Sequence, residues 1–342
     1  MMQPSAPTPD NIDRAVALLR AGELVALPTE TVYGLGADAA NPQAVARIFA
    51  AKGRPADHPL IVHLPDAEHL PRWARSIPKE ALALARAFWP GPLTLILKRE
   101  KGVPDAVTGG QDTVGVRVPG HPVALQLLRA FDSGIAAPSA NRFGRISPTT
   151  ARHVIEELDN RVAMVLDGGS CEVGIESTIL DLSSGSPRIL RPGVIGAAQI
   201  AAVIGREPLL RETGGAAGAS EASGSLHAAM LPRVSGSLAA HYAPRTPMQL
   251  LGAPALSEAV LDAARAGRRL AVLAFAPPDP SVADWQCAPR DPAQYAHDLY
   301  ASLRRLDALG ADLILVEAPP HDSAWAAVAD RLGRAAVGAG RD

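Results

Sequence analysis

The chain has 342 residues, of which 47% are hydrophobic, 20% are charged and 4% are aromatic, with a formal net charge of −2. This length suits two domains of roughly 100–200 residues, and the apolar content excludes a wholly disordered protein. The presence of only two cysteines excludes a disulfide framework and a cysteine-rich zinc module. Because no run of 18 apolar residues and no signal-like N-terminus is found, we expect no membrane span and a cytoplasmic location.

The charge is distributed evenly. Only four of the 33 basic residues are lysines, and this bias makes any single arginine weak evidence for an anion site. Basic and acidic residues balance over residues 1–205, and residues 206–342 carry a small acidic excess. We therefore expect no strong direct nucleic-acid binding, whereas a local basic pocket for a small anion stays open.

The first 205 residues alternate helix-like and strand-like segments. Hydrophobic periodicity predicts helices at 10–21, 42–51, 79–88, 122–131, 149–158 and 197–204. It predicts strands at 24–27, 60–64, 93–98, 113–118, 134–137, 162–166, 178–182 and 188–191. Because some strands follow each other without a helix, we expect an α/β domain with a mixed twisted sheet and flanking helices.

The remaining sequence predicts a linker and a second, smaller unit. Residues 212–238 are rich in Gly, Ala and Ser and have little to bury, which predicts a flexible linker. Strands at 269–275 and 312–317 flank a helix at 292–309, which favours a small Rossmann-like α/β domain. That domain lacks a G-x-G-x-x-G turn, so it offers no dinucleotide site. We divide the chain into a catalytic domain at 8–205, a linker or lid at 206–244 and a C-terminal domain at 245–342.

No common catalytic motif is present: neither a P-loop, nor H-E-x-x-H, C-x-x-C or G-x-S-x-G. Instead, the first domain has six short polar segments, several of them just after predicted strands, where α/β proteins usually bind ligands. These segments are PTETVYGLG (28–36), KGRP (52–55), TVGVRVP (113–119), AAPSAN (136–141), GIEST (174–178) and LRPG (190–193). Each alone is more often a turn, but six together indicate a shared pocket.

Two interpretations stay open for the charged residues in these segments. Lys52 and Arg54 either satisfy the end of the preceding helix or clamp a polyphosphate. Arg117, on a half-buried strand, needs either an internal carboxylate or a bound anionic ligand as its partner. His63, in an apolar strand, is more often a core residue than a ligand.

The six segments, together with PLIVH (59–63), FGRISPT (143–149) and HYAP (241–244), occur in one order over residues 28–244. In this order they resemble the YrdC-like family of L-threonylcarbamoyladenylate synthases, in its long form with an additional C-terminal domain. The resemblance implies a YrdC-like fold and a nucleotidyltransferase that forms threonylcarbamoyl-AMP and pyrophosphate from L-threonine, bicarbonate and ATP. The product would feed threonylcarbamoyladenosine modification of tRNA through a downstream transfer machinery.

The resemblance also implies a role for particular residues. L-Threonine would be held by Thr31, His63, Arg117, the Ala137 backbone and Ser177. ATP would be held by Lys52, Arg54, His58, Thr113, Ser139, Ser147, Arg191 and Tyr242. Lys52 and Arg54 would act catalytically by neutralising phosphate charge, with no covalent nucleophile, and Mg²⁺ would be held mainly by the ATP phosphates. His58 departs from the family, which often has Asn there, and His241-Tyr242-Ala243-Pro244 would fold back over the nucleotide.

Three other interpretations are compatible with parts of the sequence. The chain could be an RNA-binding module of the same tRNA pathway without turnover of its own, although its neutral charge argues against this. It could be a carbamoyl-transfer maturation factor for metal centres, but two isolated cysteines do not fit the zinc-binding cysteines of such proteins. Finally, residues 245–342 could serve only as an interaction module.

Overall fold

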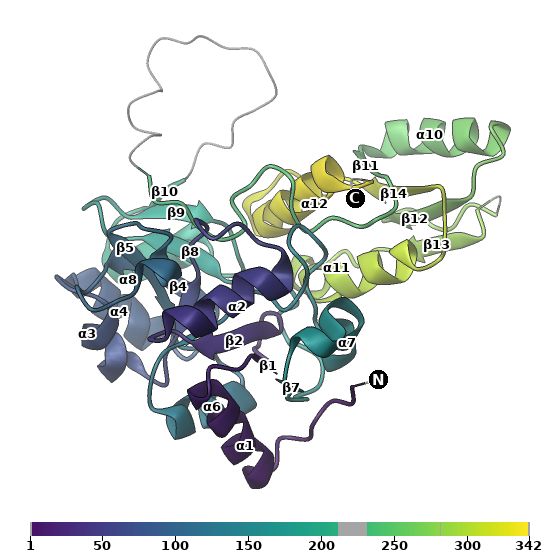
Figure 1. Ribbon diagram of the computed structural model, residues 1–342. Helices are drawn as coiled ribbons and strands as arrows, with labels where there is room; N and C mark the ends of the chain where they lie inside the picture. Colours follow the sequence, from purple (N-terminus) through teal and green to yellow (C-terminus); the bar gives the residue numbers. More distant parts are fainter. Residues whose placement is uncertain (1, 211–230, 281, 341–342) are drawn as a thin grey trace.

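The structure is a computed structural model and describes residues 2–210, 231–280 and 282–340. It contains two β-sheets, each with its own helices (Figure 1). The smaller unit stands beside the larger one, with α11 facing α7 and α10 on the far side. No helix in the described ranges is long and apolar enough to cross a membrane.

The larger sheet is mixed, as the sequence predicts, and has ten strands, two more than the eight predicted for this domain. Its order is β10 (Leu209–Leu210), β9 (Arg188–Arg191), β8 (Thr178–Asp181), β4 (Leu93–Lys98), β5 (Thr113–Arg117), β3 (Ile61–His63), β6 (Ile135–Ala136), β2 (Gly34–Asp38), β1 (Val25–Leu27) and β7 (Met164–Val165). The β3–β5 and β4–β8 pairs are parallel, whereas β4–β5 and β3–β6 are antiparallel.

Helices cover both faces of this sheet. They are α1 (Pro9–Arg20), α2 (Pro42–Lys52), α3 (Leu70–Trp73), α4 (Lys79–Phe88), α5 (Asp105–Thr108), α6 (Pro122–Phe131), α7 (Ala151–Leu158) and α8 (Ala197–Ile204), with 3₁₀ turns η1 (Ala67–His69) and η2 (Asp159–Arg161). Successive residues of a strand face opposite sides, and β1 shows this directly. Val25 and Leu27 pack with α1 and α6, while Ala26 packs in the core that contains α2.

The smaller sheet is parallel throughout, in the order β11 (Met248–Leu251), β14 (Leu313–Glu317), β12 (Leu270–Ala274) and β13 (Asp284–Cys287). Its helices are α10 (Ala253–Arg265), α11 (Pro292–Asp307) and α12 (Ala326–Gly338), with a 3₁₀ turn η3 (Ser323–Trp325). The expected α/β architecture is therefore present, with two more strands than the sequence predicted. Leu256 and Val260 of α10 pack on one face of the sheet, and α11 and α12 cover the other.

The two units share buried apolar surface. Val32, Ile146 and Ile175 of the first unit belong to the same hydrophobic cluster as Leu299 and Tyr300 of α11. Because this cluster is continuous, loops of the first unit that surround the predicted site rest directly on helices of the second.

The segment that joins the units is only partly what its composition predicts. Residues 211–230, most of the expected flexible linker, lie outside the described residues. Residues 231–238 pack specifically on the larger sheet: Val234 is buried against Ile96, Ile179 and Leu190. Arg233 donates hydrogen bonds to the carbonyl oxygens at positions 57 and 109. One valine and one arginine therefore anchor this end of the segment.

Candidate functional site

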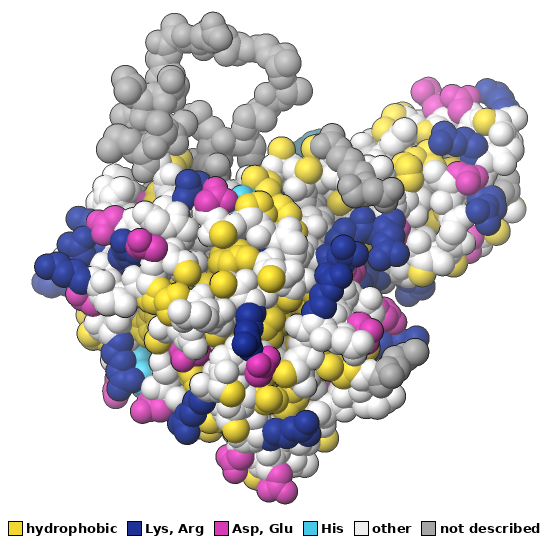
Figure 2. Space-filling view, in the orientation of Figure 1, with side chains coloured by type: hydrophobic (Ala, Val, Ile, Leu, Met, Phe, Trp, Pro, Cys, Tyr) yellow, Lys and Arg dark blue, Asp and Glu magenta, His cyan; other side chains and the backbone are white. Residues whose placement is uncertain are grey.

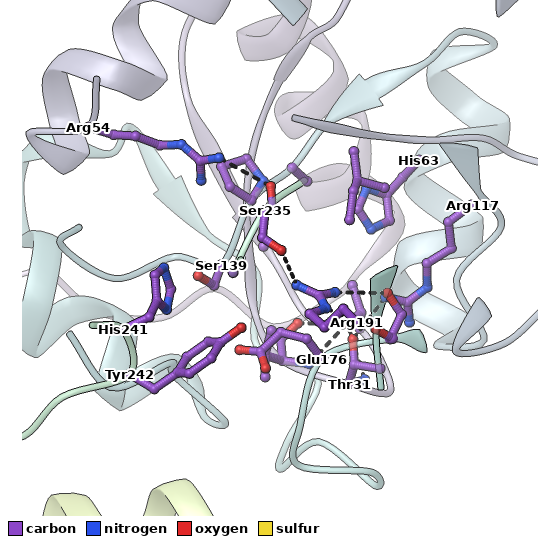
Figure 3. A pocket seen from close by; sticks show the side chains of 18 residues that line it. Thr31, Arg54, His63, Arg117, Ser139, Glu176, Arg191, Ser235, His241 and Tyr242 are labelled. Atoms are coloured by element: carbon purple, nitrogen blue, oxygen red, sulfur yellow. Dashed lines mark hydrogen bonds between the residues drawn. The ribbon is translucent and has the colours of Figure 1, made fainter. Parts of the chain in front are cut away.

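Most of the polar segments converge on one pocket at the centre of the larger sheet (Figure 3). The pocket encloses about 530 Å³ of space between protein atoms, part of which is open to solvent. Nine of the thirteen predicted residues line it. They are Thr31, Arg54, His63, Ala137, Ser139, Arg117, Ser177, Arg191 and Tyr242.

Arg117 and His63 lie side by side because β3 and β5 pair in parallel register. The Arg117 guanidinium donates to the carboxylate of Glu30 at 2.5 Å and to the Thr31 hydroxyl at 3.0 Å. A third donor, Nε, is bonded to the Gly91 carbonyl. The internal carboxylate offsets the desolvation cost of Arg117, as the first interpretation expects. Arg117 also lines the pocket, and an anionic ligand as its second partner stays a prediction.

His63 is buried, and its Nδ1 has no hydrogen-bond partner among the described residues. Burial, reinforced by the nearby Arg117 charge, lowers the pKa of His63 to about 3. The imidazole is therefore neutral at physiological pH. A buried polar atom without a partner is uncommon in folded proteins, so this nitrogen is available to a ligand.

Arg54 and Arg191 form the second cationic part of the pocket, and Ser235 bridges them. Arg54 Nη2 donates to the Ser235 hydroxyl at 3.1 Å, and Arg191 Nη1 donates to the Ser235 carbonyl at 3.0 Å (Figure 3). Burial lowers the pKa of Arg54 to about 10, so its guanidinium stays charged at neutral pH. Arg54 Nε has no partner in the described part of the chain. Arg191 also donates to the Ser177 hydroxyl at 3.2 Å.

Tyr242 closes one side of the pocket in a strained backbone conformation. Its φ is 62°, a left-handed value that costs a non-glycine residue about 1–2 kcal/mol. The ring lies against His241, with ring centroids 4.1 Å apart, and its hydroxyl has no partner among the described residues. Gly236 permits this packing, since a Cβ there would lie 2.1 Å from the Tyr242 hydroxyl oxygen. Strain of this kind often accompanies a functional role.

Glu176 forms the carboxylate at the base of the pocket. Its Oε1 accepts from the Ser147 hydroxyl at 2.6 Å, and its Oε2 accepts from Tyr300 at 2.9 Å and Arg331 at 2.8 Å. Burial alone would raise the pKa of Glu176, but the Arg331 and Arg191 charges lower it to about 2. The carboxylate is therefore ionised, and two of its partners come from the second unit.

Four predicted residues lie outside this pocket. Lys52 turns its buried ammonium to the carbonyl oxygens of Ser139 and Asn141, and burial lowers its pKa well below the usual range. Ser147 is buried on Glu176. Thr113 lines a smaller adjacent pocket beneath residues 233–235, and His58 packs edge-on against Phe143.

Sequence reasoning missed Glu30, Glu176, Ser235 and His241 as individual site residues. Glu30 and Glu176 stand within the segments that it singled out, and the cost of an unpaired Arg117 was the one signal for such a carboxylate. Ser235 lies in the Gly/Ser-rich stretch, where composition gives no signal. Within the described residues, no group of three or more His, Cys, Asp or Glu side chains is placed to hold a metal ion.

Comparison with known proteins shows two family matches that together cover most of the chain. The Sua5/YciO/YrdC family, described as "Telomere recombination", matches residues 17–193, and the C-terminal domain of threonylcarbamoyl-AMP synthase matches residues 195–337. The threonylcarbamoyl-AMP synthase of Pyrococcus abyssi is 40% identical, over 94% of this chain and 92% of that protein. The synthase of Bacillus subtilis is 42% identical, over 96% of this chain and 93% of that protein.

Solved structures give the same result. The crystal structure of P. abyssi Sua5 complexed with L-threonine is similar with a TM-score of 0.86 and 38% identity, covering 96% of this chain and 94% of that one. A P. abyssi Sua5 variant with a His-Tyr pair changed to alanines is similar with a TM-score of 0.88 and 35% identity, covering 99% of this chain and 97% of that one. The likeness therefore extends across both units.

Proposed function

This chain belongs to the Sua5/YciO/YrdC family, and from that premise we propose that it is an L-threonylcarbamoyladenylate synthase. It would form threonylcarbamoyl-AMP and pyrophosphate from L-threonine, bicarbonate and ATP. The observation that carries the proposal is the convergence of Arg54, Arg117 and Arg191 in one pocket, beside buried polar atoms that have no partner among the described residues. Three buried cations in one pocket suit substrates that bring a carboxylate and a triphosphate.

The Arg117 side of the pocket suits L-threonine. A guanidinium recognises a carboxylate through paired N–H donors, and the Arg117 guanidinium lies beside the Thr31 hydroxyl. His63, Ser177 and the Ala137 backbone complete this end and offer hydrogen bonds to an amine and a side-chain hydroxyl. The proposal agrees with the threonine complex of P. abyssi Sua5.

The Arg54 and Arg191 side suits the nucleotide. Both guanidiniums now bond to Ser235, and phosphate oxygens would compete for the same N–H donors. Ser139 and Tyr242 line this end, and Thr113 lies in the adjoining small pocket. Lys52 stays a proposed ATP contact that neutralises phosphate charge, and it also orders the loop that carries Ser139 by donating to the Ser139 carbonyl oxygen. Ser147 would act through Glu176, to which it donates a hydrogen bond, and His58 stays a predicted ATP contact.

The reaction needs no protein nucleophile. The threonine amine attacks the bicarbonate carbon and water leaves, which gives a carbamate. A carbamate oxygen then attacks the α-phosphorus of ATP, and the bond to the β-phosphate oxygen breaks to release pyrophosphate. Positioned cations lower the barrier by holding the reactants together and stabilising the developing phosphate charge, as in other phosphoryl transfers.

Magnesium fits this pocket only as a substrate-held ion. Glu176, which lines the pocket, and Glu30, which bonds to Arg117, are already paired with arginines, so they are poor metal ligands. Mg²⁺ bound to the ATP phosphates would offset part of their charge. The arginines would then neutralise the remaining charge as it moves toward the leaving pyrophosphate.

Carbamates decompose in water, so we propose that the segment ending at HYAP excludes water from the pocket. Val234 and Ser235 already cover the sheet face beside Arg54, and Tyr242 covers another side. We keep 206–244 as the proposed extent of this lid, between a catalytic domain at 8–205 and a C-terminal domain at 245–342.

The proposed setting is the cytoplasm, where the product would pass to a tRNA threonylcarbamoyl-transfer machinery. On the face seen in Figure 2, Lys and Arg side chains alternate with Asp and Glu, and the densest group of basic side chains lies where the two units meet. An RNA-binding role without turnover would favour a broad basic surface. The mixture of basic and acidic side chains on this face supports an enzyme that acts on small molecules.

The test is pyrophosphate release from ATP with each amino acid, with and without bicarbonate. We expect release that prefers threonine and requires bicarbonate. Arg54→Ala and Arg117→Ala should each abolish it, while Arg75→Ala, which removes a surface ion pair with Asp112, should not. Unchanged release in both pocket variants would refute the proposal, and salt-dependent RNA affinity without threonine-dependent turnover would support the RNA-binding alternative.

A further inference from the structure

One carboxylate in the pocket has the same sign of charge as the proposed anionic ligands. Glu176 lines the pocket, only 7% of its surface is exposed, and it is ionised at neutral pH. An uncompensated carboxylate at this position would repel the ATP phosphates and weaken the attraction of Arg54 and Arg191 for them. A pocket for anions therefore needs a cation that neutralises the Glu176 carboxylate.

The second unit supplies this cation, which is the Arg331 guanidinium of α12. Its side chain is fully buried, and its Nε donates to Glu176 Oε2 at 2.8 Å while its Nη2 donates to the Glu176 backbone carbonyl at 3.3 Å. Asp330 accepts from Nη1 at 2.6 Å. The guanidinium carbon also lies 5.3 Å from the centre of the Tyr242 ring, so Arg331 packs directly behind the pocket wall.

We propose that Arg331 is a positioning residue for nucleotide binding, which cancels the Glu176 charge and so makes the C-terminal domain part of the pocket's electrostatics. The proposal rests on the proposed synthase function for its ligand, ATP. It assigns the second domain a defined role in the site, beyond support of the fold or docking of partners.

A pH signature separates this role from a purely structural one. Glu176 is held ionised by Arg331, with Arg191 as the second cation. The other titratable groups with a charge interaction with Glu176 are Lys52, His241, Tyr242 and Tyr300. Asp330 shares Arg331 with it as a second ion-pair partner. Burial favours the protonated acid once Arg331 is removed, so the pKa of Glu176 must rise. Acid pH would then neutralise the carboxylate and restore ATP binding.

The experiment measures the dissociation constant of Mg–ATP by calorimetry between pH 4.5 and pH 8.5, because Arg191 still lowers the pKa of Glu176 in the variant. Each variant is compared with the unchanged protein at the same pH, so that protonation of ATP itself cancels. We expect Arg331→Met to weaken ATP binding about tenfold or more at high pH, and this deficit to shrink as pH falls. The double variant Glu176→Gln/Arg331→Met should bind ATP within about threefold of the unchanged protein at every pH, since Asp330 keeps Arg334 as its partner and no charge is buried unpaired.

Arg265→Met is the control. Arg265 also belongs to a helix of the second unit and pairs with Asp262 at 3.1 Å, but both side chains are exposed and neither lines the pocket. Its affinity for ATP should equal that of the unchanged protein at every pH. A flat deficit in Arg331→Met, or one that Glu176→Gln does not rescue, would overturn the proposal.

Should Arg331→Met fail to fold, Glu176→Gln alone decides the question. It removes the unfavourable charge and leaves Arg331 paired with Asp330, so ATP should bind as tightly as before or more tightly. Weaker binding by about tenfold would refute the charge argument. Because binding is measured without turnover, failure of the synthase assay and failure of this proposal are distinguishable.

Discussion

Replacing Gly174 with alanine tests whether contact between the two units shapes the pocket. Gly174 has φ +78° and packs against the backbone of α11. An added Cβ would lie 2.3 Å from the His297 carbonyl oxygen and 2.5 Å from its Cα. Neither atom belongs to a side chain that can rotate away, so the loop at 174–177 must retreat from α11 and carry Glu176 with it.

The cost follows from two contributions. An alanine with left-handed φ costs roughly 1–2 kcal/mol. Retreat of the loop stretches the hydrogen bonds from Tyr300 and Arg331 to Glu176, each worth about 1.5–3 kcal/mol because the acceptor is charged. If both are lost, the total is about 4–8 kcal/mol, which is a large share of the stability of an ordinary domain.

The assay compares Gly174→Ala with Gly185→Ala in denaturant unfolding and in pyrophosphate release. Gly185 has φ +84° with nothing within 4 Å of a built Cβ, so its variant carries the backbone strain alone. We expect Gly185→Ala to lose about 1–2 kcal/mol and keep its activity. Gly174→Ala should lose several times more stability and bind ATP weakly. Equal behaviour of the two variants would refute the reasoning.

Three further predictions concern the pocket itself. Arg117→Met leaves Glu30 buried without its partner and should cost about 3–5 kcal/mol of stability. Adding Glu30→Gln should restore most of this stability, but calorimetry should show that it does not restore threonine affinity. Restored affinity would contradict Arg117 as a threonine ligand. His63 has a pKa of about 3 when folded and about 6.5 when unfolded, so unfolding takes up a proton and stability falls as pH drops below about 6.5. In urea unfolding, His63→Gln should reduce the loss between pH 7 and pH 4 by about 3 kcal/mol, and an unchanged loss would contradict the neutral buried imidazole. Gly236→Ala should displace the Tyr242 hydroxyl and lower kcat/KM for ATP about tenfold or more, whereas unaltered kinetics would show that Tyr242 needs no such precise placement.

Local signals predicted the elements whose ends are marked in the sequence. Helices 79–88, 122–131 and 197–204 and strands 93–98 and 188–191 occur at the predicted positions. Each has a clear apolar period or a short apolar run with a distinct boundary. The strand β2, with the sequence GLGAD, was missed because glycine has low strand propensity, and pairing with β1 and β6 holds it in place.

In the second unit, the sequence predicted the two most apolar strands and the longest helix between them. The helices α10 and α12 were missed, and α10 buries only Leu256, Val260 and Ala263. Three buried residues in thirteen give a weak helical period. The edge strand β13, with the sequence DWQC, is polar and pairs only with β12, so its hydrophobic pattern gave no signal.

The pocket shows the same division between local and three-dimensional information. Motifs supplied the cations and hydroxyls, because each is a short segment of defined composition. Their partners come from elsewhere: Glu30 lies 87 positions before Arg117, and Arg331 lies 155 positions after Glu176. Sequence reasoning could state that a buried arginine needs a partner, but only the fold identifies the carboxylate that fills that role.

The most direct test of the account is the identity of the product. The protein should be incubated with ATP, L-threonine and ¹³C-bicarbonate, and the nucleotide product analysed by mass spectrometry. We predict an AMP adduct that contains one threonine and one labelled carbon, formed in equal amount with pyrophosphate. An adduct of threonine with AMP that lacks the labelled carbon, or hydrolysis of ATP without an adduct, would contradict the proposed synthase.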